Sequence, residues 1–198
     1  MASAFDNRFF NSERLGALVH QARNVTAEAV KIMELYDQIC SVVVGVGGYC
    51  MAWVGIPETD LTKSVRPVAS AGFDRGYLKA ANISWGRDER GSGPVGRAIR
   101  TGVVQINDHL REMGRMDVWR NEFTRRDYAA VMALPLCEGA RVFAVLTVYS
   151  MDEGAFRPRE IEVLSGIAEG VAAKVLGLRE MAHERISPLM QAPWEILE

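Results

Sequence analysis

Two apolar segments in the second half of the chain constrain its fold most. Residues 128–136 and 142–150 each have the length of a strand, and a short polar turn separates them. Short apolar runs rich in valine and bounded by turn residues are typical of buried strands. A third run of this kind, residues 47–55, is entered through the glycine pair Gly47 and Gly48. We therefore expect a chain built around an antiparallel sheet.

Composition narrows the class of protein. The chain has 198 residues, enough for one domain with extensions, and 48% of them are apolar, as in ordinary soluble proteins. The formal net charge of −2 gives no electrostatic support for nucleic-acid binding. The odd number of cysteines, Cys40, Cys50 and Cys137, within apolar runs indicates reduced, buried thiols and a cytoplasmic location.

One stretch resembles a membrane span. Residues 38–57 carry no formal charge, but Gly45, Gly47 and Gly48 interrupt them. The spacing at which apolar residues recur also differs before and after these glycines. A helix end followed by a strand explains that change better than a spanning helix. The first residues also lack the basic and apolar regions of a signal peptide, so we expect no membrane partner.

Helices are expected on both sides of the strands. Apolar side chains recur at helical spacing in residues 11–28, 27–44 and 158–178. A shorter helix is expected between Gly93-Pro94 and Gly102, and a charged helix over residues 115–127. Further strands are expected at about 49–56, 65–71 and 103–106. This order predicts an α+β fold in which terminal helices cover one face of an antiparallel sheet and loops cover the other.

The last helix carries two stripes. One is apolar (Ile161, Leu164, Ile167, Val171, Val175 and Leu178), and the other is made of the small residues Gly166, Gly170, Ala173 and Gly177. Glycine inside a helix costs about 1 kcal/mol relative to alanine. The small stripe therefore predicts close approach of a second helix, either the N-terminal one or its copy in a homodimer.

Taken together, several motifs resemble a GAF domain, a small-molecule sensor module. The resemblance is carried by residues 48–49, 51–55, 65–72, 83–85, 91–102, 107–108, 133–136 and 145–150, in this order and spacing. It implies a GAF/PAS-like fold with a central antiparallel sheet of five to six strands and a loop-covered ligand cavity. It is nearest to the subgroup found beside PAS, histidine-kinase and GGDEF/EAL domains in bacterial sensors.

The resemblance divides the chain into three parts. Residues 1–28 are expected to form an N-terminal helical extension, 29–178 the GAF domain, and 179–198 a helical tail or linker. The family fold implies a sensory module that signals through dimeric terminal helices. Since no effector domain follows, we expect either a separate partner protein or a longer sensor from which this chain is a part.

The fold implied by the resemblance would bring one group of side chains around the cavity. These expected ligand-binding residues are Trp53, Phe73, Tyr77, Trp85, Arg97, Trp119, Phe123 and Met132. Pockets for small molecules are mostly apolar with a few orienting polar groups, and Arg97 is the candidate for an anionic group. The alternative is that the aromatic residues are core or loop-packing residues and that Arg97 and Arg100 form a solvated helix face.

Other functions remain as alternatives. The chain can be a dimerisation or scaffold module with a filled cavity. His109 beside Asp108 is the candidate for an axial haem ligand in a gas sensor. One enzymatic lineage of the family reduces free methionine sulfoxide with cavity cysteines, but Cys40, Cys50 and Cys137 do not match its pattern, so we expect no catalysis. No histidine shares metal-ligand spacing with a cysteine, and the residues identify neither the ligand nor a cofactor.

Overall fold

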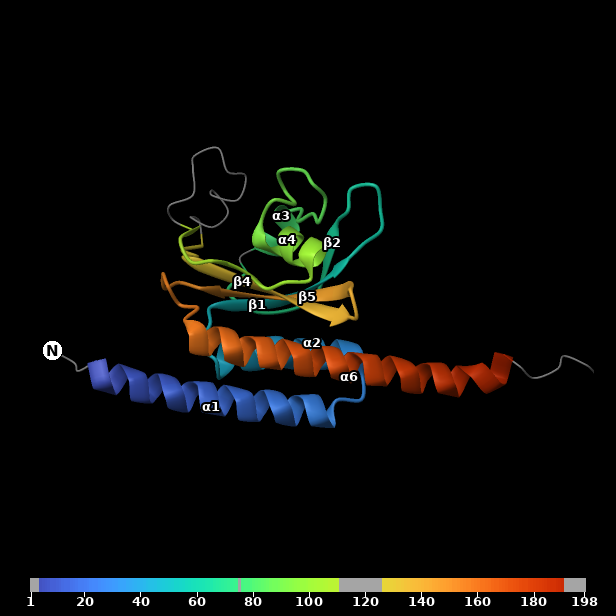
Figure 1. The fold of residues 1–198 in the computed structure, drawn as a ribbon, viewed down its shortest axis with the longest axis horizontal. Coiled ribbons are helices and arrows are strands. Elements are labelled where there is room, and N and C mark those ends of the chain that lie inside the picture. The colour runs from blue at the N-terminus through green and yellow to red at the C-terminus, as the bar shows by residue number, and fades with distance from the viewer. Residues whose placement is uncertain (1–3, 75, 111–125, 191–198) are drawn as a thin grey trace, which may run out of the picture.

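The computed structural model describes residues 4–74, 76–110 and 126–190. Its strands are β1 (Met51–Pro57), β2 (Val65–Gly72), β3 (Gln105–Asn107), β4 (Ala130–Glu138) and β5 (Arg141–Ser150). Its helices are α1 (Ala4–Glu28), α2 (Ile32–Gly45), α3 (Tyr77–Ala80), α4 (Pro94–Thr101) and α6 (Pro158–Met190). The strands form one antiparallel sheet in the order β2-β1-β5-β4-β3 (Figure 1). The expected α+β fold is thereby confirmed; the helix expected over 115–127 lies almost wholly outside the described residues.

The three central strands are buried on both faces, which explains their continuous apolar sequence. Because side chains alternate along a strand, each strand supplies two cores. The helix-side core contains the sheet residues Ala52, Val54, Ala130, Met132, Leu134, Leu136, Ala144, Leu146 and Val148. The loop-side core contains Met51, Trp53, Val65, Ala81, Ile83, Val95, Ala98, Ile99, Leu110, Tyr128, Val131, Ala133, Val145 and Tyr149.

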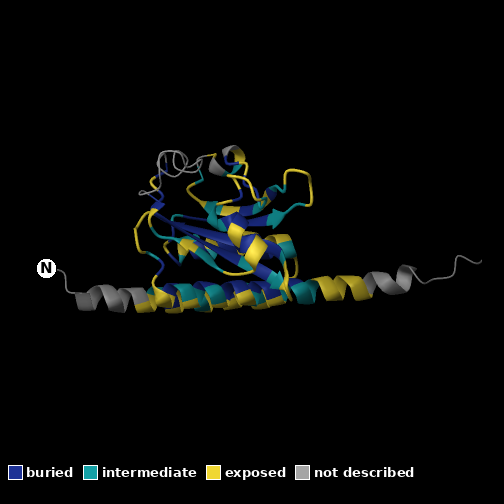
Figure 2. Ribbon diagram, turned by 45° about the horizontal axis from the view of Figure 1, so that its top comes forward, coloured by how far each residue is buried: buried dark blue, intermediate teal, exposed yellow. Residues whose placement is uncertain are grey.

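The long helices form two layers under one face of the sheet (Figure 1). Helix α2 packs against β1 and β2, and α6 packs against β4, while α1 packs on α2 and α6. In the second view the end of α6 projects past the sheet, and residues 179–184 are exposed (Figure 2). Helix α1 is therefore an outer layer that packs mainly on other helices.

Two contacts hold α1 parallel to α6. Near the middle of α1, the guanidinium of Arg14 lies 3.5 Å from the Glu160 carboxylate. Near its end, the carbonyl of Ala27 accepts a hydrogen bond of 3.0 Å from Lys174. At 1.5 Å per residue the two contacts are about 20 Å apart along each helix. The second half of α1 is thus fixed in register against the first half of α6.

The glycines of α6 do not contact α1. A Cβ atom built on Gly166, Gly170 or Gly177 would have no heavy atom within 4 Å outside its immediate surroundings in the helix. The small-residue stripe predicts close contact either with the N-terminal helix or with a second copy of the chain. The structure shows that the N-terminal helix does not make this close contact.

Helix α4 ends as expected from the sequence. Pro94 occupies its first turn, and Gly102 closes it in the left-handed region at φ 66°. Val95, Ala98 and Ile99 face the loop-side core, so α4 covers part of that face of the sheet together with the segment around Ile83.

We predict opposite effects for alanine at two glycines. A Cβ at Gly55 would lie 2.5 Å from Trp53 Cζ3 and 2.6 Å from Val65 Cγ1. Gly55→Ala should displace the indole and lower the free energy of unfolding by about 1–3 kcal/mol. Gly170→Ala, in open space on a helix, should raise it by up to about 1 kcal/mol. Urea unfolding at one fixed protein concentration measures both, and equal shifts would contradict the placement of Trp53.

Candidate functional site

A row of side chains crosses the loop side of the sheet at its centre. The strand register places Gln105, Ala133, Thr147, Trp53 and Ser70 side by side, one from each strand. Trp53 and Thr147 are both 0% exposed. The six-membered ring of Trp53 lies against Gly55, which has no side chain to obstruct it. The row therefore combines a large indole with short neighbours.

Two polar atoms in this row are unpaired. Neither Trp53 Nε1 nor Thr147 Oγ1 has a hydrogen-bond partner among the residues that the structure describes. A buried donor or acceptor that makes no hydrogen bond costs about 1–3 kcal/mol. Native folds rarely retain such groups, and each one calls for an explanation such as a bound molecule.

The neighbouring loop-side tyrosines are, by contrast, well connected. Tyr128 stacks on Tyr149 with ring centroids 4.6 Å apart. Its hydroxyl contacts Met51 Sδ at 2.9 Å and donates to the carbonyl of Phe73. Burial raises the pKa of Tyr128, and the nearby Tyr149 raises it further. Tyr128 thus joins the start of β4 to the end of β2 and remains a neutral donor.

Phe73 and Trp85 lie at the margin of this face. Phe73 follows β2 and is 37% exposed. Trp85 is half-buried against the loop-side core; its Nε1 donates to the Glu58 carbonyl at 2.8 Å, and Lys63 Nζ lies 4.6 Å from its ring centroid. Trp85 therefore ties the segment before α4 to the β1–β2 connection. The side chain of Tyr77, and Trp119 and Phe123 altogether, lie outside the described residues.

Met132 does not belong to the loop side. It is completely buried in the helix-side core, whereas its neighbours Val131 and Ala133 face the loops. Successive residues of a strand point to opposite faces. The expectation that Met132 contacts a ligand under the loops is therefore wrong.

Arg97 points outward from α4. It is exposed, and its Nε donates to the Ser92 carbonyl at 2.6 Å. Arg100 donates to the carbonyls of Trp85, Gly86 and Gly91. A Cβ on Gly96 would collide with the Gly91 and Ser84 carbonyls, so the chain's own backbone packs against the first turn of α4. This arrangement favours a loop-stapling role for Arg100 over the anion site expected here.

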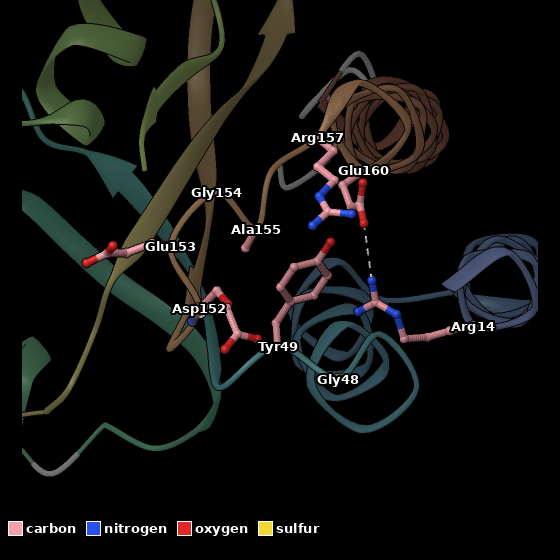
Figure 3. Close-up of a pocket in the computed structure, with 10 residues that line it drawn as sticks. Arg14, Gly48, Tyr49, Asp152, Glu153, Gly154, Ala155, Arg157 and Glu160 are labelled. Carbon is pink, nitrogen blue, oxygen red and sulfur yellow. Dashed lines mark hydrogen bonds and ion pairs between the residues drawn. The ribbon is translucent and has the colours of Figure 1, made fainter. Parts of the chain in front are cut away.

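A polar pocket of about 520 Å³ lies at the end of the sheet where α6 begins (Figure 3). Arg14 contributes three contacts there: it pairs with Glu160, donates to the Gly47 carbonyl, and lies 5.4 Å from the ring centroid of Tyr49. Glu160 is 3% exposed. Burial raises the pKa of Tyr49 to about 12, and the positive charge of Arg14 partly opposes that rise. We name this group of Arg14, Tyr49 and Glu160 the α1 latch.

A groove of about 670 Å³ runs between α1 and α6. Its floor contains small and apolar residues, among them Ala22, Gly166 and Gly170. Charges of both signs line it: Arg23, Arg159 and Lys174 are basic, and Glu162 is acidic. Two residues of the small-residue stripe, Gly166 and Gly170, thus face an open groove.

The cysteines do not form a reactive pair. Burial raises the pKa of Cys40 to about 12 and that of Cys50 to about 11, and it also raises the pKa of Cys137. The Cys50 thiol donates to the Tyr149 carbonyl at 3.1 Å. Cys137 lies toward the other end of the sheet, about 20 Å away along the strands. These thiols are protonated at neutral pH, the opposite of an activated nucleophile.

The described residues offer no metal centre. Their histidine, cysteine, aspartate and glutamate side chains nowhere gather in threes that could hold a metal ion. His109, the candidate haem ligand, is exposed, and its backbone amide is bonded to Asn107 Oδ1 at 3.0 Å. Within the described part of the chain, no helix is both long and apolar enough to cross a bilayer.

Known structures share this fold. The GAF domain of a phosphoenolpyruvate-protein phosphotransferase from Coxiella burnetii superposes with a TM-score of 0.69 at 13% identity, covering 87% of this chain and 98% of that one. A free methionine-R-sulfoxide reductase from Neisseria meningitidis, solved with its substrate, gives 0.68 at 15%, covering 84% and 91%. The GAF domain of Nlh2 from A. aeolicus, in an inactive state, gives 0.65 at 15%, covering 85% and 99%.

At these identities the structural likeness concerns the fold alone. No curated protein matches the sequence. A sequence model of the GAF domain matches residues 30–175, from just before α2 into α6. That match spans most of the chain and all five strands, and the structure shows the corresponding fold, so this chain belongs to the GAF domain family.

Proposed function

We propose that this chain is a cytoplasmic sensory module that binds a small molecule on the loop side of its sheet and signals through α1 and α6. The main support for this proposal is that Trp53 and Thr147 are fully buried and that Trp53 Nε1 and Thr147 Oγ1 have no hydrogen-bond partner in the described part of the chain. They lie in an otherwise apolar core under α4 and the neighbouring loops. An apolar environment with a few polar groups is the usual setting of a ligand site.

The central strands connect the two faces. Trp53 and Thr147 face the loops, while their neighbours Val54 and Leu146 pack in the helix-side core. A ligand can have a higher affinity for one arrangement of β1 and β5 than for another. Such a ligand would shift these strands and thereby change how they pack against α2 and α6. Such differential affinity is the requirement for a coupled response.

Helix α1 is the element on which this response would act. Apart from its packing on α2 and α6, it is held by the α1 latch and by Lys174. The latch joins α1, the residues just before β1 and the first turn of α6 in one cluster. A shift of β1 relative to α6 would separate Tyr49 from Glu160 and loosen α1. The output is then read by an effector domain or partner protein.

The second part of the proposal is a homodimer formed through the α1–α6 groove. The open glycines Gly166 and Gly170 would accept a helix of the second copy. A two-fold interface places the same surface on both sides, so it needs charges of both signs. The groove has them: Glu162 can pair with Arg23 or Arg159 of the other copy.

Catalysis is not part of this proposal. The methionine sulfoxide reductases among the similar structures share the fold, but here Cys40 is buried, Cys50 and Cys137 are half-buried, and all three thiols have raised pKa values. A thiol reductase requires an accessible thiolate and a resolving cysteine. The cysteines therefore favour a binding role.

Native mass spectrometry of freshly purified protein tests the sensory role. We expect a small molecule that leaves on denaturation, or a compound from a metabolite library that stabilises the fold. At 100 times its Kd a ligand adds about 2.7 kcal/mol, which should raise the Tm by roughly 5–10 °C. A bare polypeptide that no compound stabilises would instead support a scaffold role.

Gly170→Leu should weaken the dimer, because the larger side chain occupies the groove that receives the second helix. Sedimentation velocity at micromolar concentration should show a dissociation constant at least tenfold higher than for the wild type, with an unchanged circular dichroism spectrum. Gly16→Leu is the matched control, since Gly16 is also an open helical glycine but does not line the groove. A monomeric wild type, or equal effects of both changes, would refute the dimer.

Arg14→Met should release α1 without unfolding the sheet. The change removes the cation beside the buried Glu160 and the bond to Gly47, at a cost of about 1–3 kcal/mol. Hydrogen exchange should accelerate in residues 12–28 and remain slow in β1, β4 and β5. Lys31→Met, which breaks the exposed pair with Glu34, should change neither. Uniform acceleration across the domain would show that the latch is not local.

A further inference from the structure

Trp53 and Thr147 are opposite each other in the sheet. They are a registered pair of β1 and β5, and on one face of an antiparallel pair the Cβ atoms are about 4.5–5.5 Å apart. The indole is fixed by contact with Gly55, and Ala133 brings only a methyl group to the other side of Thr147. The two side chains, whose polar atoms have no partner among the described residues, therefore lie next to each other on the loop side.

The chemistry of these atoms restricts what can satisfy them. An indole N–H can only donate a hydrogen bond, and a threonine hydroxyl can donate a second one to the same acceptor. Both are satisfied at once by a single oxygen acceptor with two lone pairs. The surrounding side chains are apolar (Met51, Val131 and Val145). Arg97 is exposed on α4, and the Nε of the buried Arg126 donates to the Asp74 carbonyl. A neutral carbonyl can be buried in such apolar surroundings without a counter-charge, whereas a carboxylate would need one.

We propose that the ligand carries a neutral carbonyl oxygen on an apolar body, and that Trp53 Nε1 and Thr147 Oγ1 both donate to this oxygen. The inference rests on the proposed loop-side site and adds the feature of the ligand that the site selects. Trp53 and Thr147 are then specificity-determining residues. A site that hydrogen-bonds its ligand discriminates strongly against analogues that lack the acceptor, because its own polar groups are left unpaired.

The test uses two probes of the same shape. Acetophenone has the carbonyl oxygen, and α-methylstyrene replaces that oxygen with a CH₂ group. The readout is the indole N–H resonance of Trp53 in ¹H–¹⁵N NMR, assigned by its loss in Trp53→Phe. We expect acetophenone to move this resonance downfield and to bind at least tenfold more tightly than α-methylstyrene.

Threonine variants separate recognition from folding. Thr147→Val keeps the shape of the side chain but lacks the hydroxyl. It should melt at or above the temperature of the ligand-free wild type, and it should bind acetophenone at least fivefold more weakly. Thr147→Ser, which keeps the hydroxyl, should retain most of the preference for acetophenone. A Thr147→Val protein that melts well below the wild type would show that the hydroxyl is structural and would overturn the inference.

The remaining outcomes are also decisive. Equal binding of both probes would leave the loop-side site standing and refute the carbonyl contact. If neither probe perturbs Trp53, the loop-side site fails and the inference fails with it. The free protein could instead hold an ordered water that is hydrogen-bonded to Trp53. If acetophenone does not displace this water, water alone satisfies Trp53 Nε1 and Thr147 Oγ1, and the inference is wrong.

Discussion

The pairing of β1, β5 and β4 is the constraint on which the rest of this structure depends. These strands are buried on both faces, so each residue is committed to one of two separate cores. The register that places Trp53 beside Thr147 on one face also places Val54 beside Leu146 on the other. A slip of one residue would exchange the two faces, so burial on both sides fixes the register strongly. The ligand face and the helix face are therefore parts of one rigid unit.

The periphery is attached to this unit in a different way. Helix α1 reaches it through two helices and a few polar contacts, with the α1 latch near its middle and Lys174 near its C-terminal end. Regions held by few contacts are where local opening is easiest. The glycines of α6 add an open groove beside the same helix. In a sensory domain, an outer helix that packs mainly on other helices rather than on the sheet itself suits a change in the position of α1 as the output.

The sequence predicted the helices and strands well. It predicted less well on which face of the sheet or helix a given side chain lies. Apolar runs identified the three central strands β1, β4 and β5, and Pro94 and Gly102 located α4, because these signals are local. Met132 was assigned to the wrong face because the parity of β4 depends on its pairing with β5, which is not local. The outward position of Arg97 follows from the helical spacing of its buried neighbours Val95, Ala98 and Ile99, so it could have been predicted from the sequence. Thr147 was missed, although a threonine amid valines and leucines in a buried strand is a signal of its own.

A high-resolution crystal structure of the protein purified without added ligand tests the central claim most directly. The account predicts density that does not belong to the polypeptide within about 3.2 Å of both Trp53 Nε1 and Thr147 Oγ1, the outer range of a normal hydrogen bond. That density should have the size of an organic molecule and should lie between the sheet and α4. Protein groups bonded to both atoms, with the loop side closely packed and no additional density, would contradict the account.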